Sequence, residues 1–510
     1  MISSCMNTKL NVRPVFVMFA HKYYYEGPCR MAGGDAIKPG FDEIMNGHII
    51  QGNMAQIKQF MPDCVNLLDM VTIEVTDDWD IKEEYFDTLL KGREETDVYL
   101  ASNTFGADAV FNEFCIRANK PVVILPNIWN PAKSGYLYNM NVDVYTELTW
   151  EDTVKRIKNF AVRKAIAKSN ILLVPRFNYD MPKAGATDTF VDLNAVTALL
   201  GTHFRTVNLH ELLDYMKPLS PDGNYTTPGR ITPNITNEEI QECMATAKEL
   251  IAGAQETEIE EEFVVRSLIA NKTVLKTMDH YDCNAVVIPC PDCCSTRRMN
   301  QEKFTFCLNH SLNIEMGLPS TCEYDVASAV TMLALIAISG KAPYMGNTLP
   351  LVFDDEKSLA RQIAKSLPEE DIKNLLGMDN LYMVAHSTPN RKFKGINAEP
   401  MSYALRHFAY DQGFGACMRH DFNEDKGQII TLAKFSGDLK RLFIGKGTIV
   451  QSFGYKLNNC NGGFVFRVED QKAFYRAQCT CGLHLPLVFG DITQELGMLA
   501  ESYGIEPLFV

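Results

Sequence analysis

The sequence predicts an α/β protein in which two α/β domains with parallel sheets precede a third, β-rich domain of short antiparallel strands. Short β-rich runs alternate with amphipathic segments through the first two thirds of the chain, an order typical of parallel sheets with helices on both faces. Later strands are separated by glycine, asparagine and aspartate, which indicates an antiparallel barrel or sandwich. The chain has 510 residues, enough for several separate cores.

Six apolar runs in the first two thirds have the length and composition of buried strands. They are Val15–Ala20, Val98–Ser102, Pro121–Pro126, Ile171–Val174, Arg205–Leu209 and Ala285–Pro289. Between them, the segment Glu151–Ala167 places Val154, Ile157 and Phe160 at helical spacing, and Asn237–Ile251 is similarly amphipathic. The alternation of these two kinds of segment predicts the parallel sheets.

The polar residues 168–170 mark the first domain boundary. The predicted domains cover residues 1–168, 169–350 and 351–510. In the third domain we expect an acidic helix over Asp354–Leu376, followed by strands in LYMVAHS, QIITLAKF, RLFIGKGTIV, GGFVFRV and LPLVFG. The acidic run Glu256–Glu262 is interpreted as a solvated helix face.

Composition excludes several classes of partner. The formal net charge is -14, from 63 acidic side chains against 49 lysines and arginines, so neither nucleic acid nor an anionic membrane is an expected partner. The N-terminal residues lack the apolar core of a signal peptide, and the longest apolar run, Met332–Ile338, is too short to span a bilayer. We therefore expect a cytoplasmic protein whose 15 cysteines are reduced thiols.

The stretch STCEYDVASAV, residues 320–330, allows two interpretations. Ser320 and Glu323 have the spacing of a capping box before an apolar helix, Asp325 would favour the positive end of the helix dipole, and Gly340 would end the helix. Alternatively, the acidic pair is the chemical centre of an enzyme.

Two histidines favour the second interpretation. His386 ends the apolar strand in MVAHSTPN, and His484 precedes another strand in GLHLPLVFGD. A single histidine at a strand end is usually structural. Two of them, together with Glu323 at a helix start, suggest a site for a divalent metal ion.

These motifs, taken in order, resemble the L-fucose isomerase and L-arabinose isomerase superfamily. The similarity rests on CE-x-D before an apolar helix, a strand ending in histidine, ITLAKFSG and GLH…VFGD, and it is strongest from Ala285 to Asp491. The resemblance implies two Rossmann-like α/β domains and a C-terminal β-rich domain. It also implies isomerisation of an aldose to a ketose at a divalent metal, usually Mn²⁺. The substrate would be a deoxy, pentose or anionic sugar, and the protein a homo-oligomer such as a hexamer, with sites between subunits.

The resemblance assigns roles to four residues. Glu323 matches the glutamate that binds the metal and moves a proton, and His484 matches the C-terminal metal ligand. His386 matches a further histidine of the arabinose-type site, at the metal or against the substrate. Asn347 stands where fucose-type enzymes carry an aspartate that serves as metal ligand and second catalytic acid or base.

The asparagine is a departure with chemical consequences. An amide oxygen can coordinate a hard cation, but Asn347 brings no charge and cannot act as a base near neutral pH. Asp325, Asp354 or Asp355 are candidates for the missing carboxylate.

The predicted loop Pro289–Arg298, PCPDCCSTRR, follows a strand, where α/β proteins bind ligands. Arg297 and Arg298 are either surface charges or the residues that recognise an anionic sugar. The C-x-x-C pair in this loop, Cys290 and Cys293, is either a pair of plain thiols or part of a zinc site.

A cluster of polar and aromatic residues follows the first predicted strand. Its members are His21, Lys22, Tyr23, Tyr24 and Tyr25. Such a cluster suits either a sugar ring or a contact between subunits. No glycine-rich phosphate loop occurs, so nucleotide chemistry has no support.

Three functions remain open on the sequence alone. The first is a metal-dependent sugar isomerase, with Glu323 and His484 as its main residues. The second is a relative in which Asn347 has altered or abolished the standard reaction. The third is a sugar-binding regulatory protein. Because one fold hosts many functions, the geometry of the site has to discriminate between them.

Overall fold

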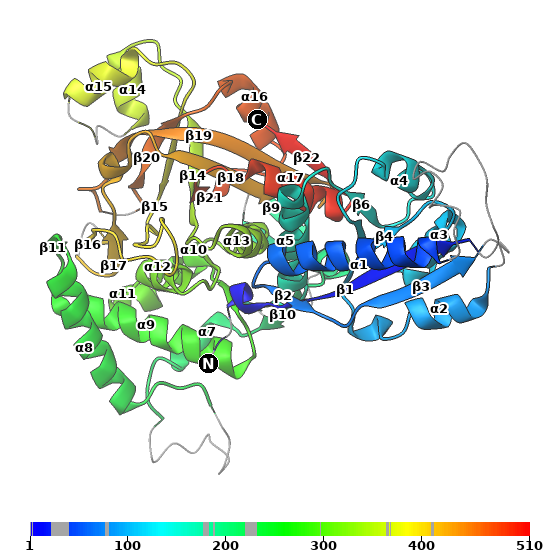
Figure 1. The fold of residues 1–510 in the computed structure, drawn as a ribbon. Helices are drawn as coiled ribbons and strands as arrows, with labels where there is room; N and C mark the ends of the chain where they lie inside the picture. The colour runs from blue at the N-terminus through cyan, green and yellow to red at the C-terminus, as the bar shows by residue number, and fades with distance from the viewer. Residues whose placement is uncertain are drawn as a thin grey trace. The chain divides into compact units, whose positions relative to one another are not determined.

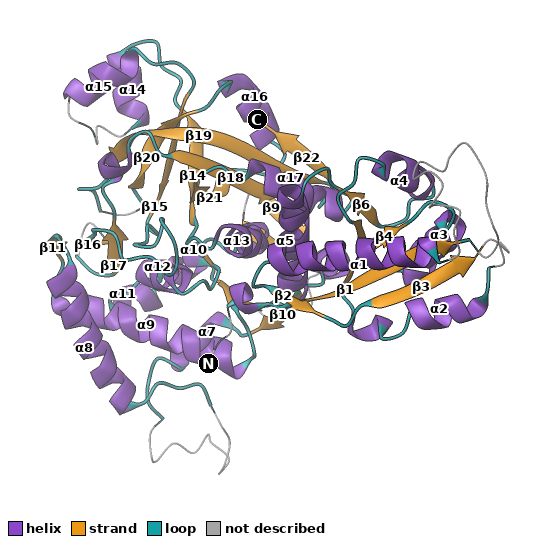
Figure 2. Ribbon diagram, viewed as in Figure 1, coloured by secondary structure: helices purple, strands orange, loops and turns teal. Residues whose placement is uncertain are grey.

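The computed structural model describes residues 1–510 except positions 1, 3, 22–39, 77–80, 177–182, 187–188, 220–231, 296, 364–366, 368, 410–412 and 459. The chain divides into two compact units. One is Thr8–Ala161, and the other combines Met1–Asn7 with Val162–Val510. Both contain a parallel sheet with helices, as predicted, and Figures 1 and 2 show their elements.

The unit Thr8–Ala161 is built on a parallel sheet of six strands in the order β2-β1-β4-β5-β6, with β3 also paired to β1. Its strands are β1 (Leu10–Ala20), β2 (Val65–Leu67), β3 (Val71–Thr76), β4 (Val98–Asn103), β5 (Val122–Ile124) and β6 (Val144–Thr146). Its helices are α1 (Phe41–Phe60), α2 (Glu83–Leu89), α3 (Asp108–Ala118) and α4 (Asn130–Asn139), and α5 (Trp150–Ala167) leads into the second unit.

Strand β1 shows why this sheet needs helices on both faces. Successive side chains of a strand point to opposite faces. Val15 and Val17 belong to one apolar core and Phe16 and Met18 to another. The near-continuous apolar run of β1 is therefore buried on both sides, as in other parallel sheets.

The second unit begins with a smaller parallel sheet, in the order β10-β7-β12-β13. The strands are β7 (Asn170–Leu173), β10 (His203–Thr206), β12 (Ala285–Val287) and β13 (Ser320–Thr321). The longer helices around it are α6 (Leu193–Leu200), α8 (Asn237–Gly253), α9 (Glu261–His280), α12 (Cys307–Glu315) and α13 (Val326–Ser339). The shorter elements are α7 (Leu209–Asp214), α10 (Cys290–Ser295), α11 (Arg298–Glu302) and the hairpin of β8 (Lys183–Ala186) and β9 (Thr189–Asp192).

The C-terminal strands close into an antiparallel barrel, in the order β18-β21-β14-β15-β20-β19 with β19 returning to β18. The strands are β14 (Tyr344–Pro350), β15 (Leu381–His386), β18 (Ile429–Phe435), β19 (Arg441–Phe453), β20 (Gly462–Arg467) and β21 (His484–Phe489), and β22 (Glu506–Phe509) pairs in parallel with β19. The helices here are α14 (Glu356–Gln362), α15 (Glu369–Leu376), α16 (Gln471–Gln478) and α17 (Thr493–Ser502).

Helix α13 connects the parallel sheet of this unit to the barrel (Figure 1). Most of its residues are apolar, and all are buried from Val326 to Ile336, as expected for a helix enclosed on every side. The helix shares one core with Val287 of the parallel sheet and with Phe435 and Val488 of the barrel. The turn before α13 is thereby held against the barrel strands.

Three predictions about single elements are wrong. The acidic helix expected over Asp354–Leu376 is two helices, α14 and α15. The sequence has a proline at 368, which lacks the N–H that a helix interior needs. The acidic run Glu256–Glu262 is not one helix face, because Glu256–Glu258 forms β11, and α9 starts only afterwards. The strand expected over Arg205–Leu209 is β10, which ends at Thr206.

Strand β11 carries two glutamates that form ion pairs with a buried arginine. It pairs with β16 (Ala404–His407), which pairs with β17 (Ala416–Arg419). Arg406 of β16 is fully buried, and its guanidinium is ion-paired with Glu256 and Glu258. The charge of the acidic run therefore neutralises a buried cation, which local sequence patterns do not reveal.

Candidate metal centre

Three side chains from distant parts of the chain meet at one point: Glu323, His386 and His484. Their potential ligand atoms all lie within 4.8 Å of one another. His386 Nε2 is 3.6 Å from Glu323 Oε1, and His484 Nε2 is 3.2 Å from Glu323 Oε2. Both histidines are almost completely buried, whereas the Glu323 side chain is about one third exposed. Among the described residues this is the one group of its kind that could share a metal ion.

The barrel brings the two histidines together at the middle of β14. Asn347 of β14 lies opposite Ala385 of β15 on one side and opposite His484 of β21 on the other. Strand β15 therefore ends, at His386, at the level where β21 begins. On the side of β15 away from β14, β20 approaches so closely that a Cβ on Gly463 would lie 1.9 Å from the carbonyl oxygen of Val384 in β15. Glycine is required there.

Glu323 reaches this point from an unusual turn between β13 and α13. Glu323 and Tyr324 both have left-handed backbone conformations, with φ of 57° and 61°. The turn is held by hydrogen bonds from Tyr324 N to Ile288 O, at 3.2 Å, and from Asp325 N to Cys322 O, at 3.3 Å. Two consecutive residues in this region cost free energy, and such strain is concentrated at functional sites.

We therefore expect Glu323→Gly to be more stable than Glu323→Ala, by about 1 kcal/mol. Both variants remove the carboxylate, but glycine adopts a positive φ without the steric penalty that alanine pays. Chemical denaturation of the two variants in metal-free buffer measures the difference. Equal stabilities would show that the turn relaxes and stores no strain.

The predicted capping box at Ser320 and Glu323 is wrong. The N-cap of α13 is Asp325, whose carboxylate accepts from the backbone N–H of Ser328 at 2.8 Å. Ser320 lies in β13, with its Oγ 2.8 Å from His310 Nδ1. Because Asp325 caps the helix, the carboxylate of Glu323 is left to face the two histidines.

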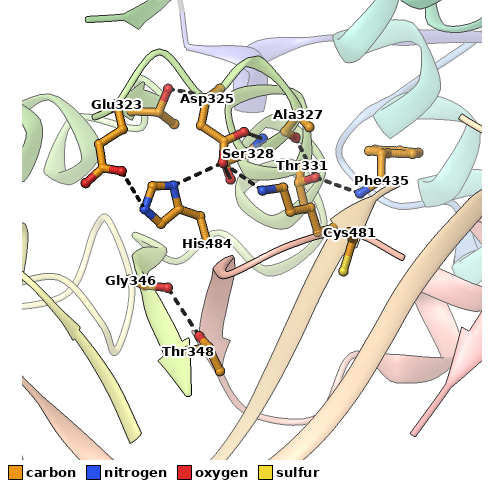
Figure 3. A network of polar contacts seen from close by, with 12 residues as sticks. Glu323, Asp325, Ala327, Ser328, Thr331, Gly346, Thr348, Phe435, Cys481 and His484 are labelled. Atoms are coloured by element: carbon orange, nitrogen blue, oxygen red, sulfur yellow. Dashed lines mark hydrogen bonds and ion pairs between the residues drawn. The ribbon is translucent and has the colours of Figure 1, made fainter. Parts of the chain in front are cut away.

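Asp325 also contacts the site from the far side of His484. Its Oδ2 is 3.3 Å from His484 Nδ1 and 2.7 Å from the ammonium of Lys434. Figure 3 shows the imidazole of His484 between the two carboxylates, one ring nitrogen facing each. Asp325 therefore contacts the ring nitrogen opposite the one that faces Glu323.

These contacts shift the pKa values of the group. The neighbouring imidazoles of His386 and His484 hold the pKa of Glu323 well below its usual range, so its carboxyl is ionised at neutral pH. Burial alone would lower the pKa of His484, but Asp325 and Glu323 raise it to about 9. Burial lowers the pKa of His386, which favours a neutral imidazole. Glu323 and His386 are therefore in the protonation states that bind a divalent ion, whereas His484 has to release a proton to bind one.

The unpartnered nitrogens of His386 fit a metal ion. Among the described residues, neither Nδ1 nor Nε2 of this buried ring has a hydrogen-bond partner, and the contact with Glu323 is too long to be one. Leaving a buried polar atom unpaired is costly. Two imidazoles and one carboxylate suit Mn²⁺, Zn²⁺ or another divalent ion, with further positions left for water or substrate.

Asn347 has a defined place beside this group. Since it lies directly opposite His484, the two side chains leave the same face of the sheet. Of the alternative carboxylates, Asp355 caps α14, where its side chain accepts a hydrogen bond from the backbone N–H of Ser358 at 2.8 Å. Asp325 contacts the opposite ring nitrogen of His484, as described above.

Of the residues predicted for substrate binding, Arg297, Arg298 and His21 are not part of the Glu323 group. The segment Pro289–Arg298 is not a plain loop, because it contains α10. Arg297 is exposed at the N-cap of α11, and Arg298 donates to Asp214 at 3.2 Å. His21 lies in the other unit, where its Nδ1 is 2.7 Å from Asp42. Tyr23 lies outside the described residues. Cys290 and Cys293 lie in α10, outside the Glu323 group.

Two polar residues near the site escaped the sequence analysis. Lys434 is part of the motif ITLAKFSG. A lysine between apolar residues of a predicted strand could have indicated a buried charge. His310 of α12 is fully buried and has an unpartnered Nε2 among the described residues. Burial lowers the pKa of His310 to about 3, so its ring is neutral at physiological pH. Nothing in the local sequence distinguished it.

Comparison with known proteins adds no relative. No protein-family model matches this chain, and no curated protein matches it significantly. The fold and the site define a mixed α/β protein with a buried candidate centre for a divalent metal ion. No helix among the described residues is long and apolar enough to cross a bilayer.

Proposed function

We propose that the protein is a cytoplasmic, divalent-metal-dependent isomerase that interconverts an aldose and a ketose. One observation carries the proposal. An ionised and partly exposed carboxylate, Glu323, faces two buried histidines contributed by different strands. This arrangement combines a metal site with a base that a small substrate can reach.

The proposed reaction moves a proton between two neighbouring carbon atoms of the sugar. The proton next to a carbonyl is only weakly acidic, and a divalent ion at this site would supply Lewis acidity that stabilises the developing negative charge. His386 and His484 would hold the ion. Glu323 removes the proton from one carbon and returns it to the next, a role that contributes roughly 10²- to 10⁴-fold to a rate. A second proton passes from the hydroxyl oxygen of the aldose to its carbonyl oxygen, so that the product is the isomeric ketose.

Asn347 favours a second candidate function. The residue lies opposite His484, where the resemblance to fucose-type enzymes calls for an aspartate, and its amide cannot take or give a proton near neutral pH. A protein with this site could bind a metal ion and a sugar without isomerising it. The second candidate is therefore a sugar-binding relative of the isomerases.

Metal analysis followed by a sugar panel separates the two. The protein is purified, its bound metals are measured, and it is assayed against aldoses with a chelator and after Mn²⁺ is restored. Isomerase activity that the chelator abolishes and Mn²⁺ restores supports the first function. Bound metal and sugar without turnover support the second. A protein that binds no divalent ion contradicts both the metal centre and the isomerase.

A further inference from the structure

A lysine is fully buried within the barrel next to the candidate metal centre. Lys434 of β18 and its partner Asp325 both have completely buried side chains, with Nζ 2.7 Å from Oδ2. Its neighbours in the strand, Ala433 and Phe435, belong to the core that surrounds α13. Taking two charges out of water is expensive, and an apolar pair of similar size often serves stability equally well. Stability alone therefore gives little reason for this pair.

The contacts of Asp325 suggest the reason. Its carboxylate accepts from the N–H and the hydroxyl of Ser328, at 2.8 Å each, and from Lys434. The oxygen that binds Lys434 is also the one that faces His484 Nδ1, at 3.3 Å. These donors leave the carboxylate a single orientation. Figure 3 shows it directed at the ring of His484.

This orientation determines which nitrogen of His484 is available. An ionised carboxylate only accepts hydrogen bonds, so the Nδ1 that faces Asp325 must carry the hydrogen. A metal ion that displaces the second proton of the ring therefore meets the lone pair of Nε2, the nitrogen that faces Glu323 at 3.2 Å. In metal sites, a carboxylate on the far nitrogen of a histidine ligand fixes the tautomer and orients the ring.

We propose that Lys434 and Asp325 are positioning residues of the metal centre. Lys434 holds the Asp325 carboxylate against His484 Nδ1, and Asp325 in turn presents His484 Nε2 toward Glu323. Neither residue touches the ion itself. The inference rests on the proposed metal centre and adds two residues through which the barrel controls it.

The test measures Mn²⁺ affinity by calorimetry in wild type, Lys434→Met, Asp325→Asn and the double variant, all checked by circular dichroism for folding. Each single variant is expected to bind about 10- to 100-fold more weakly, as is usual when an outer partner of a metal ligand is lost. The double variant should be no worse than the weaker single variant, because both residues act through His484. Lys446→Met removes an exposed lysine from the adjacent strand, 3.4 Å from Asp491, and should leave affinity unchanged.

The outcomes separate this inference from the proposed function. If wild type binds no divalent ion, the metal centre and the isomerase are wrong. If wild type binds Mn²⁺ and the folded variants bind it equally well, the positioning role is wrong while the metal centre stands. If Lys434→Met alone fails to fold because it leaves Asp325 unpaired, the double variant, which removes both charges, gives the same decision. If the double variant lost as much Mn²⁺ binding free energy as the two single variants together, the two residues would not act through His484 in common.

Discussion

The variant Glu323→Gln is expected to lose isomerase activity by at least about 10²-fold and to bind Mn²⁺ more weakly than the wild type. Glutamine keeps the size and a carbonyl oxygen but can neither take a proton nor offer a negative charge to a cation. Because Asp325, and not Glu323, caps α13, the substitution should leave the protein folded. Initial rates on the aldose that the wild type converts, together with Mn²⁺ titration, measure both effects.

The matched control is Glu356→Gln. Glu356 is exposed in the first turn of α14, so it is a glutamate near a helix N-terminus but outside the Glu323 group. The control should keep full activity and metal affinity. If Glu323→Gln retained full activity and metal affinity, Glu323 would be a structural residue and the proposed function would fail.

The variant His386→Leu is expected to bind Mn²⁺ more than about 100-fold more weakly while becoming more stable in its metal-free form. The loss of a ligand should exceed the 10- to 100-fold cost of losing an outer partner. The gain in stability, about 1–3 kcal/mol, follows because the two unpartnered ring nitrogens of His386 are removed from the interior. Mn²⁺ titration and urea denaturation in the presence of a chelator measure the two effects.

His420→Leu provides the opposite case. His420 is also buried, but its ring nitrogens lie 2.6 Å from Asp425 and 3.0 Å from the carbonyl oxygen of Ser402. Replacing it leaves Asp425 without this partner, so the variant should be less stable and should bind Mn²⁺ normally. If His386→Leu were destabilised to the same degree and kept its metal affinity, His386 would be a structural histidine.

Local sequence patterns predicted the elements of secondary structure well. The predicted strands at Val98–Ser102 and Ala285–Pro289 are β4 and β12, and the helix predicted at Glu151–Ala167 is α5. Apolar periodicity and turn residues report the conformation of their own segment, so they were sufficient here. They failed at Glu256–Glu262, where pairing with a distant strand and a buried arginine overrides the local helical signal.

The sequence also identified Glu323, His386 and His484 as candidates, because each lies at the end of a regular element where side chains are free to meet a ligand. Only the tertiary structure decided that they meet. Their convergence depends on β14 pairing with both β15 and β21, and on α13 packing between sheet and barrel. Such long-range pairings have no local signature.

By itself, then, the sequence determined the order and type of the elements and the donor atoms that could form a site. The tertiary structure decided that Asp325 caps α13, that Glu323 occupies a left-handed turn, and that Lys434 is buried against Asp325. The physical reason is the distance along the chain over which each kind of interaction acts. Backbone preferences and apolar periodicity act over a few residues, whereas ion pairs such as that between Lys434 and Asp325 form only after folding joins segments more than a hundred residues apart.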